Sequence, residues 1–139
     1  MAITTTMCTS FKQEILEAEH DFTADTFKIA LYADTATLGA ATTAYSTSDE
    51  VTGTGYTAGG ATLTTVAPTT SNSVAFVDFN DVTFSNSTIT ARGALVYNSS
   101  KSNKAVASYD FGANQSSSSS TFTVEFPTAA SGTAIVRIE

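Results

Sequence analysis

The feature that most restricts the fold is a pair of alternating segments, Gly93 to Asn98 and Ala105 to Phe111, joined by a short polar loop. In both segments apolar side chains recur at every second residue, as in a β-strand, whose successive side chains point to opposite faces of a sheet. The short loop predicts that they pair as an antiparallel hairpin. Apolar residues also occupy the second face, so we expect this hairpin inside a sandwich or at an interface.

Further strands are predicted on both sides of the hairpin. Thr26 to Tyr32 alternates in the same way and predicts a central strand with one buried face. Shorter strands separated by turn residues are expected at Ala61 to Val66, Val74 to Phe79, Val82 to Phe84, Thr88 to Ala91, Thr121 to Phe126 and Thr133 to Ile138. Turns are expected at Pro68 to Asn72, Asn80-Asp81 and Asn86-Ser87, and the serine run Asn114 to Ser120 predicts a flexible loop.

The chain is expected to form one domain, residues 1–139: a mainly β protein with a single antiparallel β-sandwich, jelly-roll or Ig-like, and one short N-terminal helix. Residues 1–9 show no periodicity and predict a flexible arm, or a strand that becomes ordered only on a partner. Residues 10–20 predict the helix, because Ser10 and Gln13 have the spacing of a capping box and the apolar residues that follow lie near one helical face.

Composition limits the function. Six basic and thirteen acidic residues give a formal charge of −7, which disfavours nucleic acid as a partner. We find no signal peptide and no apolar run long enough to span a membrane, so we expect a soluble protein without a membrane partner. Cys8 is the only cysteine and is interpreted as an inert thiol near a mobile terminus. The sequons at Asn86, Asn98 and Asn114 are interpreted as accidents of a Ser/Thr-rich composition.

The segment Glu50 to Leu63, EVTGTGYTAGGATL, imitates a nucleotide-binding motif. Gly53, Gly55 and Ala58 satisfy G-x-G-x-x-G/A, but a dinucleotide site needs a helix after the glycines, and here a β-like segment follows. We therefore predict a glycine-built turn or bulge, with positive φ at Gly55 or Gly59 and with Tyr56 packed on the sheet.

Two pairs of neighbouring residues raise the possibility of catalysis. His20 beside Asp21 resembles a base and its orienting carboxylate, but adjacent side chains rarely face each other, and we expect a histidine at the C-terminal end of the helix. Asp49 and Glu50 are paired carboxylates, but glycoside hydrolysis needs carboxylates that face each other across a cleft. We assign no catalytic residue.

Asp78, Asn80 and Asp81 offer oxygen ligands at a spacing that Ca²⁺ could use. The same spacing is typical of a tight turn between strands, which we favour because no glycine or glutamate of a calcium loop accompanies it. Binding of a cation by these three residues is left open, and no cofactor-binding or metal-binding residue is assigned.

Two connections are expected at the surface. The long polar segment from Ala33 to Ser48 is predicted to lie on the surface, anchored by Leu38 and Tyr45. The loop of the central hairpin, Asn98 to Lys104, carries two of the six basic residues, one of them Lys101. Together with the N-terminal arm, this loop is our candidate for contacts with a partner.

Four segments resemble a known family: SFKQEILEAEHDF, DTFKIALYADTATLGAATTAYSTSDEV, GTGYTAGGATL and ITARGALVYNSSKSNKAVASYDFG. They are similar to small virion structural proteins of tailed bacteriophages of the marine or cyanobacterial type. The resemblance extends from about Phe11 to Glu139. It identifies no residue that makes a known contact.

The resemblance implies a non-enzymatic capsid decoration or cement protein. Such a subunit would bind and stabilise the lattice of the major capsid protein, or bind other virion proteins, as a homo-oligomer. It would be assembled in the host cytoplasm and lie on the capsid exterior, where an acidic surface is well tolerated. The alternative is a tail, collar or fibre module that binds a host surface or another virion protein. An unrecognised hydrolase is a third hypothesis and would require an exposed nucleophile.

Overall fold

The computed structural model describes residues 2–127, 129–130 and 132–138. It contains one helix and eight strands within these residues: β1 (Thr6–Met7), α1 (Thr9–Leu16), β2 (Phe27–Tyr32), β3 (Ala61–Thr62), β4 (Thr65–Ser71), β5 (Val74–Phe79), β6 (Val82–Asn98), β7 (Lys104–Val124) and β8 (Val136–Ile138). The strands form a five-stranded sheet in the order β1-β7-β6-β2-β3 and a three-stranded sheet in the order β4-β5-β8. Every strand pairing within these sheets is antiparallel. The predicted mainly β, sandwich-like fold with one short helix is confirmed.

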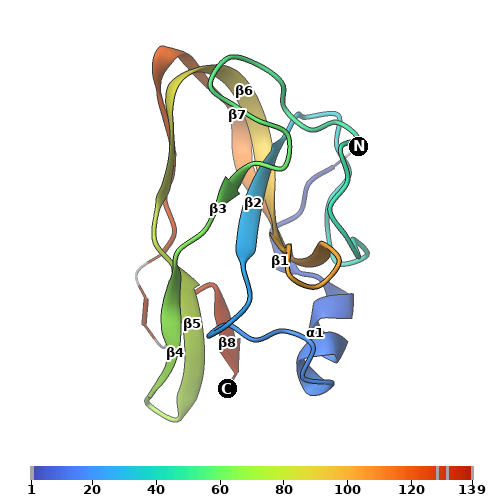
Figure 1. Cartoon of the computed structure of the whole chain (residues 1–139), viewed down its shortest axis with the longest axis vertical. Helices are drawn as coiled ribbons and strands as arrows, with labels where there is room; N and C mark the ends of the chain where they lie inside the picture. Colours follow the sequence, from blue (N-terminus) through green and yellow to red (C-terminus); the bar gives the residue numbers. More distant parts are fainter. Residues whose placement is uncertain (1, 128, 131, 139) are drawn as a thin grey trace.

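The long hairpin of β6 and β7 is the frame of the molecule. In Figure 1 its ribbon rises along the left side, bends across the top and descends to the turn beside α1. The paired segments Gly93 to Asn98 and Lys104 to Asp110 confirm the predicted central hairpin. β2 pairs with β6 over this part of the hairpin, from Phe27 opposite Asn98 to Tyr32 opposite Gly93.

The other half of this hairpin was predicted incorrectly. The serine run Asn114 to Ser120, expected as a flexible loop, is part of β7 and pairs with β6. The strands expected at Val82 to Phe84 and Thr88 to Ala91 are one strand, and the turn expected at Asn86-Ser87 is a bulge in it. Asn86 has a φ of 50°, which lets the strand absorb an extra residue without reversing direction. Serine has a modest strand preference of its own, so pairing with β6 decides its conformation.

The N-terminal residues are also more ordered than predicted. The flexible arm expected at residues 1–9 is wrong for the described part, because Thr6 and Met7 pair with Ser108 and Ala107 of β7. Ile3 is buried, and its neighbour Thr4 donates a backbone hydrogen bond of 2.9 Å to the carbonyl of Leu38. Burial of Ile3 offsets the entropy lost when this segment is fixed.

The helix is shorter than the predicted 10–20. α1 begins at Thr9, ends at Leu16, and has Cys8 at its N-cap with no side-chain cap hydrogen bond. The expected capping box does not form, and Ser10 Oγ is buried without a hydrogen-bond partner. Phe11 is the buried residue of α1, and its contact with the core stabilises a helix too short to persist alone.

The strands near the chain's middle and end follow the prediction with three changes. β5 has the predicted bounds, Val74 to Phe79, whereas the strand expected at Ala61 to Val66 is divided between β3 and β4. The turn expected from Pro68 to Asn72 is wrong for Pro68 to Ser71, because these residues belong to β4. Pro68 lies at a register shift between Val66 and Thr69, where its missing N–H is tolerated. The predicted strand at Thr133 to Ile138 is shortened to β8.

One hydrophobic cluster contains residues of both sheets and of α1. Phe22 and Phe27 are stacked with their ring centroids 4.5 Å apart, and Phe27 lies 5.8 Å from Phe79 of the smaller sheet. This aromatic contact joins the two sheets at the Phe27 end of β2. The alternation in β2 correctly predicted the buried Phe27, Ile29 and Leu31, but the opposite face is buried as well.

Candidate functional site

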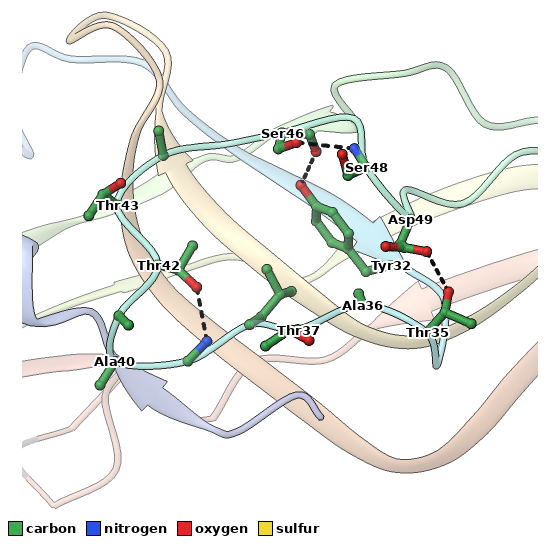
Figure 2. Close-up of a pocket in the computed structure, with 14 residues that line it drawn as sticks. Tyr32, Thr35, Ala36, Thr37, Ala40, Thr42, Thr43, Ser46, Ser48 and Asp49 are labelled. Carbon is green, nitrogen blue, oxygen red and sulfur yellow. Dashed lines mark hydrogen bonds between the residues drawn. The ribbon is translucent and has the colours of Figure 1, made fainter. Parts of the chain in front are cut away.

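A large hollow lies inside the connection between β2 and β3. It has a volume of about 700 Å³, and Figure 2 shows the chain from Thr35 to Asp49 curving around it, with the Tyr32 ring against one side. Its lining consists mainly of alanine, threonine and serine. The hollow therefore offers a neutral surface of small side chains, with Asp49 as its only charged lining residue.

The polar groups around this hollow are used to hold the loop. Tyr32 donates a hydrogen bond of 2.6 Å to the carbonyl of Ser46, and Thr35 donates one of 2.6 Å to Asp49 Oδ1. The backbone N–H of Gly39 donates to Thr42 Oγ1 at 3.0 Å. These contacts, drawn as dashed lines in Figure 2, fix the loop's shape.

The two predicted anchors of this connection are confirmed. Leu38 is buried and exchanges backbone hydrogen bonds with the N-terminal segment. Tyr45 is half-buried and stacks on Tyr97 of β6, with ring centroids 4.7 Å apart and an interplanar angle of 17°. The surface loop is thus attached at one side to the N-terminal segment and at the other to the core of the large sheet.

The glycine-rich segment is a compact turn organised by the carboxylate of Glu50. Tyr56 and the N–H of Gly59 each donate a hydrogen bond of 2.7 Å to Glu50 Oε1, and Tyr45 donates one of 2.7 Å to Oε2. The Tyr56 hydroxyl also accepts from the N–H of Leu31 at 2.9 Å, which confirms that Tyr56 packs on the sheet. Tyr97 closes the network by donating to the carbonyl of Gly59 at 2.6 Å.

The backbone of this turn explains its glycines. Gly55 has a φ of 81°, Gly59 of 95° and Gly60 of 76°, values that favour glycine, and the predicted positive φ is confirmed. Gly60 is the most restricted, because a Cβ there would overlap the carbonyl oxygen of Ile29 in β2. After Gly60 the chain enters β3 and no helix follows. The arrangement that a dinucleotide's phosphates require is missing from Gly53, Gly55 and Ala58.

Burial and the carboxylate of Glu50 keep the surrounding tyrosines protonated. Burial, followed by its hydrogen bond to Glu50, raises the pKa of Tyr45 to about 12. The pKa values of Tyr32, Tyr56 and Tyr97 are raised as well, with burial as the largest cause in each. These hydroxyls act as hydrogen-bond donors at neutral pH, which suits a structural network.

A second polar cluster forms around His20, which is buried in the space between α1 and the hairpin turn. His20 Nε2 lies 3.1 Å from Glu14 Oε1, and His20 Nδ1 lies 3.0 Å from Asn98 Nδ2. The Asn98 amide also donates to Asp25 at 2.8 Å. Since Asn98 Nδ2 is a donor, His20 Nδ1 accepts here, and Nε2 carries the proton that faces Glu14.

This geometry corrects the interpretation of His20. We expected a histidine at the end of the helix, but α1 ends at Leu16, and His20 lies beyond it in the core. Asp21 does not orient it, because the Asp21 carboxylate accepts from Thr23 at 2.6 Å and 2.8 Å. The real partner Asn98 lies 78 residues away in sequence. Nothing in the local sequence indicates that pairing.

The hairpin loop Asn98 to Lys104 is also engaged within the chain. Asn98 is fully buried, and Lys104 Nζ lies 3.2 Å from Glu19 and 3.6 Å from Glu14. Ser100 Oγ accepts a hydrogen bond of 2.8 Å from the N–H of Thr26. The loop's side chains therefore attach it to α1 and to the start of β2, and they are only partly available for a partner.

The remaining candidate residues are separated from one another. Asp49 and Glu50 make different contacts, the first with Thr35 and the second with the tyrosines, so they do not face each other across a cleft. Cys8 is fully buried, and burial, followed by the charge of Glu14, raises the pKa of its thiol to about 11. A thiol held protonated in this way is a poor nucleophile.

Asp78, Asn80 and Asp81 do not converge. Asp78 is buried, whereas Asn80 and Asp81 are exposed, and Asp81 Oδ1 accepts a hydrogen bond of 2.7 Å from the N–H of Phe126. Asp78 Oδ1 accepts from the N–H of Phe79, but its Oδ2 is buried without a hydrogen-bond partner. Burial raises the pKa of Asp78 above its ordinary value. Within the described residues, no group of three His, Cys, Asp or Glu side chains is placed to hold a metal ion.

Compared with protein-family models, with curated proteins and with solved structures, the chain has no significant match. None of the described helices is long and apolar enough to cross a membrane.

Proposed function

We propose that this chain is a non-enzymatic structural protein of a phage virion, a capsid decoration or cement protein that binds the lattice of the major capsid protein. The observation that carries the proposal is the open edge of β7. From Gly112 to Val124, β7 pairs with β6 on one side, and no described strand pairs with it on the other. Such an edge can add a strand of a partner protein through backbone hydrogen bonds.

The side chains along this edge support close approach of a partner. Most residues from Gly112 to Thr121 are exposed, and five consecutive serines, Ser116 to Ser120, lie in this stretch. Native proteins usually protect an open edge with lysine or proline, and this stretch contains neither. A small, neutral, uncovered edge is suited to a repeated contact on a protein lattice.

The internal polar networks support a stable, stiff subunit. Glu50 ties the glycine-rich turn to β2 and β6, and His20 with Asn98 ties the region after α1 to the hairpin turn. Fully satisfied buried networks of this kind favour one well-defined conformation. A cement protein needs this property, since it must keep its shape without disulfides in a reducing cytoplasm.

Copy number in purified virions tests the proposal. We expect the chain in numbers comparable with the major capsid protein, measured by gel densitometry of particles. A few copies per particle would favour the tail, collar or fibre module instead, and absence from the particle would overturn both assignments.

An edge variant tests the contact. Ser118→Lys places a charge on the open edge of β7, and we expect it to reduce occupancy on capsids without unfolding the subunit. Thr83→Lys, at an exposed position of β6, is the matched control and is expected to keep full occupancy. Equal occupancy of both variants would show that the edge of β7 is not the contact.

A further inference from the structure

An apolar groove lies between α1 and the edge strand β8, both near the lower end of the molecule in Figure 1. It consists of adjoining hollows of about 230 Å³ and 110 Å³ that share Ile15, Val136 and Ile138 in their walls. β8 pairs with β5 on one side only, so its other edge is left unpaired within the described residues. The groove is distinct from the serine edge of β7 and from the hollow beside Tyr32.

The groove has an apolar side chain standing at its rim. Leu16 is 88% exposed and Ile138 is 59% exposed, and they are the large hydrophobic residues that the described chain leaves in water. Both line the larger hollow. A protruding leucine beside an apolar hollow is unusual on a monomer, because contiguous exposed apolar surface commonly marks an interaction site.

The exposed Leu16 of one copy can enter the groove of a second copy when a two-fold axis relates the two. In such an isologous interface the same patch meets itself, so a knob and a hollow must lie side by side on one molecule. Leu16 and the groove satisfy this condition. With the two α1 helices antiparallel, Leu16 of one copy would lie over Phe11, Lys12 and Ile15 of the other.

The charges at the rim agree with the same orientation. Lys12 and Arg137 line the groove, and Glu17 follows Leu16 at the C-cap of α1. In the antiparallel arrangement Glu17 of each copy approaches Lys12 of the other. The chain as a whole carries a charge of −7, so two copies repel each other unless unlike charges meet locally. This local complementarity favours a second copy over an unrelated acidic or basic partner.

We propose that α1 and β8 form an isologous interface between two copies of this chain, in which Leu16 of each copy fills the apolar groove of the other. The interface does not require the virion role proposed above. It leaves the open edge of β7 free, so a dimer can still bind another protein through that edge.

Sedimentation of the full-length chain, from low to high micromolar concentration, tests the interface. The wild type is expected to form a dimer, and Leu16→Asp is expected to raise its dissociation constant by about tenfold or more, since a central apolar anchor is replaced by a charge. Ser118→Asp, an exposed position in the serine-rich half of β7, is the matched control and should leave the dimer intact. Circular dichroism would verify that Leu16→Asp keeps the fold, as expected for an exposed side chain.

A charge exchange tests the orientation. Lys12→Glu places like charges opposite each other and should weaken the dimer, whereas Lys12→Glu combined with Glu17→Lys should restore it. A wild type that stays monomeric throughout, or a dimer that Leu16→Asp does not weaken, would overturn the interface. If the double variant dissociates as readily as Lys12→Glu alone, the antiparallel pairing is wrong.

Discussion

The two halves of the β6–β7 hairpin share the same antiparallel backbone pairing but differ in burial and in the strands beside them. In the half near the turn, Ala94 to Tyr97 are at most 2% exposed, and β2 and β1 flank the pair on its two sides. In the serine-rich half, the facing side chains form hydrogen bonds such as Ser87 Oγ to Ser117 Oγ at 2.7 Å, and most of β7 is exposed.

Pairing with a single neighbouring strand is therefore enough to form a strand, whereas a core requires further strands beside the pair. Backbone pairing satisfies the peptide groups in both halves. Only the turn half buries apolar side chains on both faces, and burial is the dominant favourable term in folding. We therefore expect the turn half to carry the stability of the fold and the serine-rich half to serve the surface.

The largest effect is expected from Leu95→Ala in the turn half. Leu95 is fully buried between Ala30 and Ser108, so the substitution leaves a cavity and should lower the free energy of unfolding by about 2–5 kcal/mol. Urea denaturation measures the change. A loss below about 1 kcal/mol would mean that the turn half is not the core we describe.

The glycine-rich turn covers the same half, and Glu50→Ala tests how much that cover contributes. The substitution leaves Tyr45, Tyr56 and the N–H of Gly59 without their acceptor, and we expect a loss of about 2 kcal/mol. Asp49→Asn is the matched control, because Asp49 is exposed and asparagine tolerates its φ of 61°. If both variants lose the same free energy of unfolding, the hydrogen bonds of Glu50 contribute no more to stability than the contact of Asp49.

Asp78 lies on β5, which leads directly into the serine-rich half, and it should make stability depend on pH. Its pKa in the folded protein is raised above the ordinary 3.8 by burial, so the folded state binds the proton more tightly than the unfolded state. The free-energy cost of burying the ionised Asp78 carboxylate is absent at pH values below the ordinary pKa and reaches its full size above the folded-state pKa.

Asp78→Asn should consequently be more stable than the wild type at pH 7, by about 1 kcal/mol, with the difference disappearing in acid. Thermal unfolding of both proteins between pH 3 and pH 7 would measure it. A difference that stays constant with pH would show that Asp78 is not held at a raised pKa.

The smallest effect is expected in the serine-rich half itself. Ser116→Ala removes a side-chain hydrogen bond of 2.8 Å to Thr90 at an exposed position and should change stability by less than about 0.5 kcal/mol. Amide hydrogen exchange should be faster from Ser116 to Ser120 than from Leu95 to Tyr97, because fewer buried contacts resist local opening. Equal protection of the two segments would contradict the comparison.

Burial also explains which elements the sequence could predict. β5 was predicted with its observed bounds, β2 to within one residue, and the hairpin from its alternation, because burial of alternate side chains leaves a local pattern. The serine strand was missed because its residues are all polar and show no alternation of apolar and polar side chains. The helix was predicted too long, because the chain leaves the helical conformation after Glu17, at Ala18 with a φ of 60°, and then carries His20 into the core.

The candidate sites were predicted unevenly for the same reason. Backbone positions with positive φ favour glycine, which is a local property. The glycines of Glu50 to Leu63 were therefore enough to predict a turn in place of a nucleotide-binding loop. The pairing of His20 with Asn98 joins residues 78 positions apart. Glu50 and its partners Tyr56 and Gly59 are close in sequence, but the folded turn is what brings the carboxylate to the hydroxyl and the N–H. Such contacts leave no periodic signal.

Local periodicity, backbone freedom and composition are enough to predict the mainly β class, the central hairpin, the glycine-built turn and the acidic charge. Three features become visible only in the folded chain: the N-terminal segment docks on β7, the serine run is a strand with an open edge, and Leu16 lies beside an apolar groove. Whether a strand edge is paired, or an apolar side chain covered, depends on which distant segments lie next to it, and that is settled when the chain packs.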